Sequence, residues 1–161
     1  MRRSMPSSPR STSSRSGVRP DSPAVIDTMV FSWVFSSADL SGRAARYAAH
    51  LTGRRLLMSA QTAAELRYGA LSRNWGEARR EQLERRIERV SVVPIDDDLT
   101  KVYAEVKDRC RRAGHALAQK DHDGDRWIAA TAIKLELSLI SDDGLFEDVP
   151  GLLLITERGE R

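Results

Sequence analysis

Four acidic residues stand beside short apolar runs that are spread along the 161-residue chain: Asp27, Glu65, Asp125 and Asp143. Two of these acids directly follow runs that are typical of buried strands, and the other two fall where helices are expected. If the runs form one parallel sheet with its helices, the four carboxylates converge at the carboxyl edge of that sheet. Clustered carboxylates repel one another, so this pattern predicts a site that holds a divalent metal ion.

The metal expected at such a site is Mg²⁺ or Mn²⁺, because these hard cations prefer oxygen ligands. A few convergent carboxylates with open coordination positions suit phosphodiester hydrolysis, since the metal activates a water and neutralises charge on the phosphate. The sequence contains no Gly-x-Ser-x-Gly elbow and no phosphate-binding glycine-rich loop. A covalent mechanism is therefore not indicated.

Each acid also has an ordinary structural explanation. An Asp after a strand is often a helix cap or a turn residue, Asp125 could cap its own helix, and Glu65 could lie on a solvated helix face. Glu65 is the hardest to explain in this way, because Ala60, Ala63 and Leu66 around it suggest a buried helix surface, where an unpaired carboxylate is costly. Taken jointly, the four positions favour the metal site.

The elements that must position these acids alternate along the chain. Strands are expected over Ala24–Ile26, Leu56–Ser59, Ser91–Ile95, Leu137–Ile140 and Leu152–Ile155. Amphipathic helices are expected over about 41–52, 60–71, 76–89, 97–112 and 124–136, with Ser41 as an N-cap and Gly53 as a stop for the first of these. This alternation predicts one α/β domain over residues 24–156 with a mainly parallel sheet.

Three neighbours of the acids are candidates for supporting roles. Thr28 can donate a hydrogen bond to a ligating carboxylate or to a metal-bound water. Arg67 and Arg126 flank two of the acids and could hold an RNA phosphate, although Arg67 could instead pair with a carboxylate.

The net charge of +3 does not describe the domain. Residues 1–22 carry five arginines and one acid, a charge of +4, so the remaining 21 basic and 22 acidic residues sum to −1. This Ser-, Arg- and Pro-rich tail is expected to be disordered. Nucleic-acid binding therefore cannot be argued from the total charge.

The composition also limits the compartment. One cysteine, Cys110, excludes an internal disulfide and is expected to be buried, which fits a reducing environment. No apolar run is long enough for a transmembrane helix. We therefore expect a cytoplasmic protein without a membrane partner.

Three further patterns have competing interpretations. The run Asp96–Asp98 looks like a metal cluster, but it precedes a helix and is better read as its cap. The arginines between Arg79 and Arg89 could contact phosphate, but interleaved glutamates favour a solvated face. The apolar segment Met29–Phe35 is either a buried helix or an exposed patch for self-association or a partner helix.

The motifs around the four acids resemble the PIN-domain ribonucleases, especially the VapC toxins of prokaryotic toxin–antitoxin pairs. Two elements carry most of the resemblance: Glu65-Leu66-x-x-Gly69-Ala70 and Asp125-x-x-Ile128-Ala129-Ala130. Either element alone would be weak, but their order and spacing are specific in combination. The matching segments are Val25–Thr28, Ser59–Ala70, His122–Ala132 and Leu139–Phe146.

The resemblance implies a three-layer PIN-like fold, with a five-stranded parallel sheet between helices. It also implies a Mg²⁺- or Mn²⁺-dependent endoribonuclease that leaves a 3′-hydroxyl and a 5′-phosphate and is inhibited by a cognate VapB-like antitoxin. By resemblance, Asp27 and Asp125 are the foremost metal ligands, with Glu65 and Asp143 as further metal-site acids.

The resemblance extends to the loop that carries Asp143. Ser141 matches the hydroxyl residue that usually supports the first Asp in this family. Asp142 is an extra carboxylate, so either Asp142 or Asp143 could face the metal, and the spacing to Phe146 favours Asp143. Asp123 is read as a loop or capping residue, with an outer role at the metal as the alternative.

Two other functions remain open at the level of the sequence. A nuclease that acts on DNA or on structured RNA, in repair or in processing, would use the same acids. A PIN-like binding module without turnover is the second alternative, although the presence of all four acids argues against it. A homodimer is possible.

Overall fold

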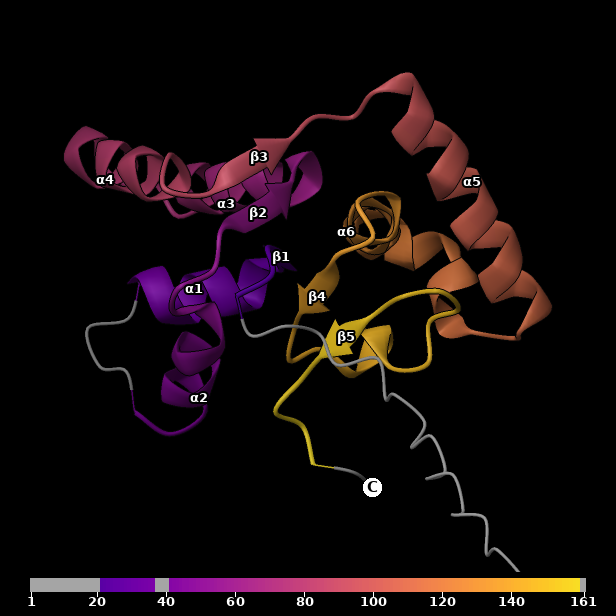
Figure 1. Ribbon diagram of the computed structural model, residues 1–161. Coiled ribbons are helices and arrows are strands. Elements are labelled where there is room, and N and C mark those ends of the chain that lie inside the picture. Colours follow the sequence, from indigo (N-terminus) through magenta and orange to yellow (C-terminus); the bar gives the residue numbers. More distant parts are fainter. Residues whose placement is uncertain (1–20, 37–40, 160–161) are drawn as a thin grey trace, which may run out of the picture.

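The computed structural model describes residues 21–36 and 41–159 of the chain. Its centre is one sheet of five parallel strands in the order β3-β2-β1-β4-β5, seen in Figure 1. The strands are β1 (Ala24–Ile26), β2 (Leu56–Ser59), β3 (Ser91–Val93), β4 (Ser138–Ile140) and β5 (Leu154–Ile155). The predicted α/β class and the parallel sheet are confirmed.

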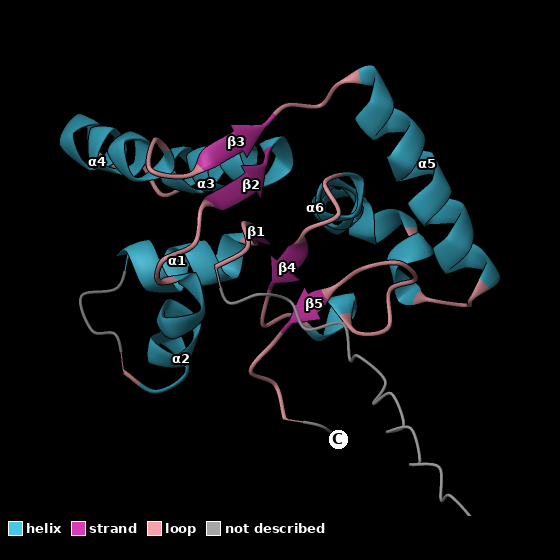
Figure 2. Cartoon of the chain, viewed as in Figure 1, coloured by secondary structure: helices cyan, strands magenta, loops and turns pink. Residues whose placement is uncertain are grey.

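Helices cover both faces of the sheet and complete three layers (Figures 1 and 2). Four of them share a core with one face: α1 (Thr28–Ser36), α2 (Gly42–Leu51), α3 (Ala60–Ser72) and α4 (Glu77–Ile87). The other face packs against α5 (Asp97–Arg112) and α6 (Asp123–Lys134). Three single 3₁₀ turns, η1 (Ala116–Ala118), η2 (Lys120–His122) and η3 (Gly144–Phe146), lie in the connections.

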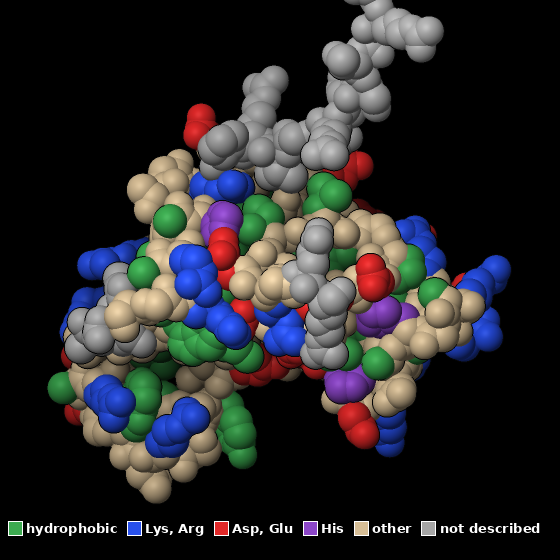
Figure 3. Space-filling model, turned by 90° about the horizontal axis from the view of Figure 1, so that it is seen from below, with side chains coloured by type: hydrophobic (Ala, Val, Ile, Leu, Met, Phe, Trp, Pro, Cys, Tyr) green, Lys and Arg blue, Asp and Glu red, His purple; other side chains and the backbone are tan. Residues whose placement is uncertain are grey.

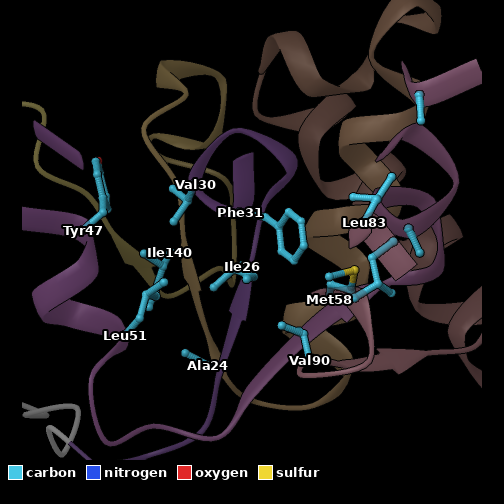
Figure 4. Packing of buried hydrophobic residues seen from close by; sticks show 13 residues of the cluster. Ala24, Ile26, Val30, Phe31, Tyr47, Leu51, Met58, Leu83, Val90 and Ile140 are labelled. Carbon is cyan, nitrogen blue, oxygen red and sulfur yellow. The ribbon is translucent and has the colours of Figure 1, made fainter. Parts of the chain in front are cut away.

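The two cores follow from alternation along each strand. Ile26, Met58 and Ile140 belong to the core shared with α1–α4 (Figure 4), whereas Val25 and Leu139 belong to the core shared with α5 and α6. Successive side chains of a strand point to opposite faces, so a strand buried on both faces is apolar throughout. The central strand β1 is fully buried, as a parallel strand between two helical layers must be.

Element boundaries differ from the sequence predictions by a few residues. The strand expected over Ser91–Ile95 ends at Val93, because Pro94 has no backbone N–H to donate to the sheet. The last strand is reduced to Leu154–Ile155. Helix α5 has the predicted bounds, and α2 ends as expected before Gly53, whose φ of 75° lies in the left-handed region that glycine adopts without strain.

The apolar segment Met29–Phe35 forms most of α1, and its inner side is buried. Val30 and Phe31 have no exposed surface, and Phe35 stacks on Phe31 with ring centroids 4.9 Å apart. Trp33 packs against the same core, and Met29 is 38% exposed. The segment is therefore mainly a core helix.

The Asp96–Asp98 run acts as a helix cap. Asp96 is the N-cap of α5, and its carboxylate accepts a hydrogen bond of 2.8 Å from the Leu99 N–H. Asp97 and Asp98 lie in the first turn, where the helix dipole favours acidic side chains. The capping interpretation is confirmed.

The predicted tail falls almost wholly on residues 1–20, which lie outside the described residues. Within the described part of the chain, no helix has the length and apolar character that crossing a bilayer requires.

A buried tyrosine ties α2 to the segment after β5. The Tyr47 hydroxyl donates to Asp142 Oδ1 at 2.8 Å and accepts from the Glu157 N–H at 2.7 Å. Both the Tyr47 ring and Asp142 are buried, so the loss of the hydroxyl leaves polar groups without a partner away from water.

Replacing this hydroxyl tests the link. Tyr47→Phe should lower the free energy of unfolding by about 1–3 kcal/mol, because buried polar groups lose their partner. Urea denaturation measures the loss. Tyr68→Phe is the matched control, since Tyr68 is 72% exposed, and its stability should stay at the wild-type value. Equal stability of Tyr47→Phe and wild type would contradict the assignment.

Candidate functional site

The four predicted acids line one small cavity at the carboxyl edge of the sheet. The cavity has a volume of about 110 Å³, and its walls include both charged and apolar side chains. The acids come from four separate segments: the end of β1, the second turn of α3, the first turn of α6 and the loop after β4. The lining residues are Asp27, Thr28, Met29, Glu65, Asp125, Ile128, Asp143 and Phe146.

Asp27 is the most buried of the four acids, with 4% of its surface exposed. One carboxylate oxygen accepts a hydrogen bond of 2.7 Å from the Val30 N–H, and the other accepts from the Ser141 hydroxyl. The predicted supporting residue Ser141 thus joins the end of β1 to the loop after β4.

Burial raises the pKa of Asp27 from 3.8 to about 6. The hydrogen bonds from Ser141 and Val30 act in the opposite direction, and the neighbouring Asp143 raises the pKa further. The charge on Asp27 is therefore held at a cost in free energy, which a bound cation would offset.

Glu65 faces the cavity from α3. This helix begins directly after β2, because the Ser59 hydroxyl caps it by accepting from the Thr62 N–H at 3.0 Å. The Glu65 carboxylate accepts hydrogen bonds from the Thr28 hydroxyl and, at 3.0 Å, from the Gln61 amide. Glu65 is half-buried, and the sequence had suggested a more buried surface.

Asp125 lies in the first turn of α6 and faces the same cavity. Burial raises its pKa, the charges of Asp143 and Glu65 add to this, and His122 opposes it. The His122 ring nitrogen Nδ1 lies 3.5 Å from Asp125 Oδ2. The charges of the acids at this edge thus act on one another and favour the protonated form of Asp125.

Asp142 and Asp143 are adjacent but point in different directions. Asp143 lines the cavity and also accepts a hydrogen bond of 2.9 Å from the Leu145 N–H. Asp142 turns away to the Tyr47 hydroxyl and to the Arg43 guanidinium, 2.8 Å from each. Of the two alternatives that the sequence left open, Asp143, which the spacing to Phe146 favoured, is the one that lines the cavity. Asp142 instead holds the loop from its other side, so a supporting role for it beside a metal is not what the structure shows.

The prediction that Arg126 could hold an RNA phosphate is wrong. This arginine has no exposed surface, and its guanidinium donates to the backbone oxygens of Leu117 and Gln119 and to the side chains of Tyr103 and Asp123. A side chain held in this way is out of reach of an RNA phosphate. Asp123, at the start of α6, accepts hydrogen bonds from Arg126 and Tyr103 and does not line the cavity.

Arg67 is half-exposed and paired. Its guanidinium contacts both carboxylate oxygens of Glu84, at 3.0 and 2.8 Å. Of the two interpretations of Arg67, pairing with a carboxylate agrees with the structure, and the partner is Glu84.

Sequence reasoning missed three residues around the cavity. Gln61 and His122 hydrogen-bond or face the acids, as described above. Gly124 permits α6 to approach α3, because a Cβ there would lie 2.9 Å from the Gln61 amide nitrogen and 3.2 Å from Glu65 Oε1. The Gly124-Asp125 pair was visible as a signal, since a glycine beside a site acid often marks a close approach.

The donor set fits a hard divalent cation, because every charged ligand candidate lining the cavity is a carboxylate. In residues 21–36 and 41–159, no three His, Cys, Asp or Glu side chains converge as closely as the ligands of a metal ion do. The acids share a cavity, but the carboxylates of Asp27 and Glu65 accept hydrogen bonds from the hydroxyl groups of Ser141 and Thr28.

The fold and site define an α/β protein with clustered acids at the carboxyl edge of a parallel sheet. Comparison with known families makes this specific: the sequence matches the PIN domain over residues 24–152. The chain belongs to the PIN-domain family, the nuclease family that its motifs resembled. No curated protein matches the sequence.

Several solved structures share this fold, among them a member of the VapBC family of toxin–antitoxin systems. A chain of VapBC2 from Rickettsia felis, bound to a promoter DNA fragment, matches with a TM-score of 0.68 and 20% identity over 83% of this chain and 98% of that one. FitAcB from Neisseria gonorrhoeae matches with a TM-score of 0.65 and 23% identity, over 83% of this chain and 96% of that one. VapBC-5 from Mycobacterium tuberculosis matches with a TM-score of 0.59 and 24% identity, over 83% of this chain and 98% of that one.

The cost of the Asp27 charge can be measured in the metal-free protein. Asp27→Asn should raise the free energy of unfolding at about pH 7.5 by up to about 3 kcal/mol, since each unit of pKa shift corresponds to about 1.36 kcal/mol. The folded-state pKa is above the unfolded value. The wild type is therefore penalised as the pH rises from about 4 to 6, and the penalty is absent below that window.

Urea denaturation in EDTA, followed from about pH 4 to 8, checks this expectation. The advantage of Asp27→Asn should be present near neutral pH and should close towards pH 4. Asp121→Asn is the control, because Asp121 is exposed and does not line the cavity. An advantage that grew as the pH fell would have the wrong sign and would rule out a buried, charged Asp27.

Proposed function

We propose that this chain is a metal-dependent endoribonuclease that acts in the cytoplasm as the toxin of a toxin–antitoxin pair. One observation carries the proposal: four acids from distant segments of a PIN-domain chain line a single cavity. The raised pKa values of Asp27 and Asp125 support it, because carboxylates held at such a cost are typical of functional sites.

Asp27 and Asp125 would hold the ion, with Glu65 and Asp143 completing the acidic site. A bound Mg²⁺ or Mn²⁺ would supply charge stabilisation for the phosphate and a water of lowered pKa. Ser141 and the Val30 N–H fix the orientation of Asp27, and Thr28 does the same for Glu65. Fixed ligands lower the reorganisation that the reaction requires.

The apolar wall of the cavity has its own part. Met29, Ile128 and Phe146 line the cavity beside the acids. They limit the access of bulk water and so strengthen the interaction between the carboxylates and any cation. An RNA phosphodiester would approach from the open side, next to the half-exposed Glu65 and Asp125.

An antitoxin partner is proposed on the likeness of fold to chains of VapBC complexes. We infer that a VapB-like protein binds this chain and suppresses its activity. A growth test supports or refutes the toxin role: expression of the wild type should arrest growth, expression of Asp27→Asn should not, and co-expression of a small neighbouring gene product should relieve the arrest.

Cleavage of RNA tests the site. With Mg²⁺ or Mn²⁺, the wild type should cut single-stranded RNA and leave a 3′-hydroxyl and a 5′-phosphate, and EDTA should stop it. Asp27→Asn and Asp125→Asn should each lower the rate by at least about a hundredfold, because the ion loses a charged ligand. End mapping and initial rates give the readout, and circular dichroism checks that the variants fold.

Asp121→Asn serves as the control in the same assay, and DNA of the same sequence is included as an alternative substrate. Cleavage of the DNA alone would favour the rival nuclease function. If calorimetry gives no heat when Mg²⁺ or Mn²⁺ is added to the wild type, the inert binding module is favoured. Wild-type activity in Asp27→Asn would refute the site assignment.

A further inference from the structure

A second depression lies next to the acidic cavity and has no role in the site described so far. We call it the distal groove; it lies between α1, α3 and the start of α4 and has a volume of about 500 Å³. It shares Thr28 and Glu65 with the acidic cavity, so the two adjoin. At its far end it is lined by Arg73, Trp75 and Arg79.

We propose that the distal groove binds single-stranded RNA next to the scissile phosphate, with a base stacked on Tyr68 and a phosphate held by Arg73. This inference rests on the proposed nuclease function and deepens it, since it names the path of the substrate. The argument has three parts: the position of an exposed aromatic ring, the distribution of charge and the hydroxyl groups along one wall.

Tyr68 is the exposed ring. It lines the groove and is 72% exposed, which is high for a large aromatic side chain. It lies three residues after Glu65 on α3, so the two side chains share one face of the helix. Aromatic side chains beside a backbone track are the usual platforms for the bases of single strands, since every base has a face that can stack.

The charges of the groove are ordered along its length. Glu65, the one acid lining it, lies at the end that meets the cavity, and Arg73 and Arg79 lie at the other end. Within the described part of the chain, neither arginine has a carboxylate partner. The Arg79 guanidinium is 3.7 Å from the centroid of the Trp75 ring, which leaves its outer face open to a phosphate or a base.

The neighbouring depression on the other side of α3 and α4 gives a contrast. It has a similar volume, about 570 Å³, but four glutamates line it together with three arginines. Arg67 pairs there with Glu84, and Arg85 with Glu81. That depression is therefore unsuited to a polyanion, and its residues provide matched controls.

The wall formed by α1 is hydroxylic. Thr28, Ser32 and Ser36 line the groove at intervals of four residues, so they form one row along the helix. Hydroxyl groups can both donate to and accept from the 2′-hydroxyl of a ribose, which distinguishes RNA from DNA. From Glu65 to Arg73 the helix axis covers about 12 Å, a length that a few nucleotides span.

The face of the molecule seen in Figure 3 carries acidic and basic side chains interspersed, with several acids near its middle. Together with a domain charge of −1, this gives little long-range attraction for RNA. Retention of a substrate must then come from a local track such as the distal groove.

Binding of a fluorescently labelled twelve-nucleotide RNA, measured by anisotropy in EDTA, tests the proposal independently of cleavage. Tyr68→Ala and Arg73→Ala should each weaken binding by roughly tenfold, and Arg73→Ala should lower the dependence on salt by about one ion. Arg85→Ala removes the same charge from the neighbouring depression and should bind as the wild type does.

Cleavage of long and short substrates separates this inference from the proposed function. If the wild type cuts RNA, Tyr68→Ala and Arg73→Ala should raise KM for the twelve-nucleotide RNA by roughly tenfold. A trinucleotide is too short to fill the groove, so Tyr68→Ala and Arg73→Ala should cut it at the same rate as the wild type does.

If the wild type cuts neither substrate, the proposed function fails. The anisotropy measurement still shows whether the distal groove binds RNA. If Tyr68→Ala and Arg73→Ala bind the long RNA as tightly as the wild type, the proposal is overturned and the groove is left to a protein partner. An equal loss in Arg85→Ala would also overturn it, because the effect would then be one of general charge.

Discussion

The buried carboxylate at the end of the central strand is the constraint on which the rest of the site depends. Asp27 follows a strand that is wholly enclosed between two helical layers, so its charge enters a region with little water. Two hydrogen bonds stabilise this carboxylate, one from the first turn of α1 and one from Ser141 beyond β4. Because Ser141 also accepts from the Asp143 N–H at 3.0 Å, a single hydroxyl positions two of the four acids.

The polar groups behind the site hold its loops without taking part in it. Asp142 and Tyr47 secure the loop after β4 from one side of the sheet. Arg126 secures the turns before α6 from the other by donating to the oxygens of Leu117 and Gln119. A buried arginine is costly unless its donors are satisfied. The terminal nitrogens Nη1 and Nη2 of Arg126 donate hydrogen bonds, whereas its Nε has no partner among the described residues. The bonds from Nη1 and Nη2 hold the path of the chain into the helix that carries Asp125. The acids are thus supported from both faces of the sheet.

The four acids and the parallel sheet could be predicted from sequence, because strand ends and helix starts are local signals and a parallel sheet collects them at one edge. The direction of a side chain could not. Asp142 and Asp143 are alike in sequence, and only the tertiary partners Tyr47 and Arg43 decide which one leaves the cavity. Arg126 looked like a phosphate ligand beside Asp125, but the backbone oxygens that accept hydrogen bonds from its Nη1 come from a turn with no sequence signature.

Charge density links these observations to function. A site that concentrates carboxylates repels a polyanion unless cations are supplied, and this domain carries no excess of basic residues to supply them at long range. For the proposed function, the cations would be local: a metal ion held by the acids, and guanidinium groups that no carboxylate neutralises. In the neighbouring depression, Arg67 and Arg85 pair with Glu84 and Glu81, whereas Arg73 and Arg79, which line the distal groove, have no carboxylate partner among the described residues. These two arginines are the electrostatic basis of the proposed substrate path along the distal groove.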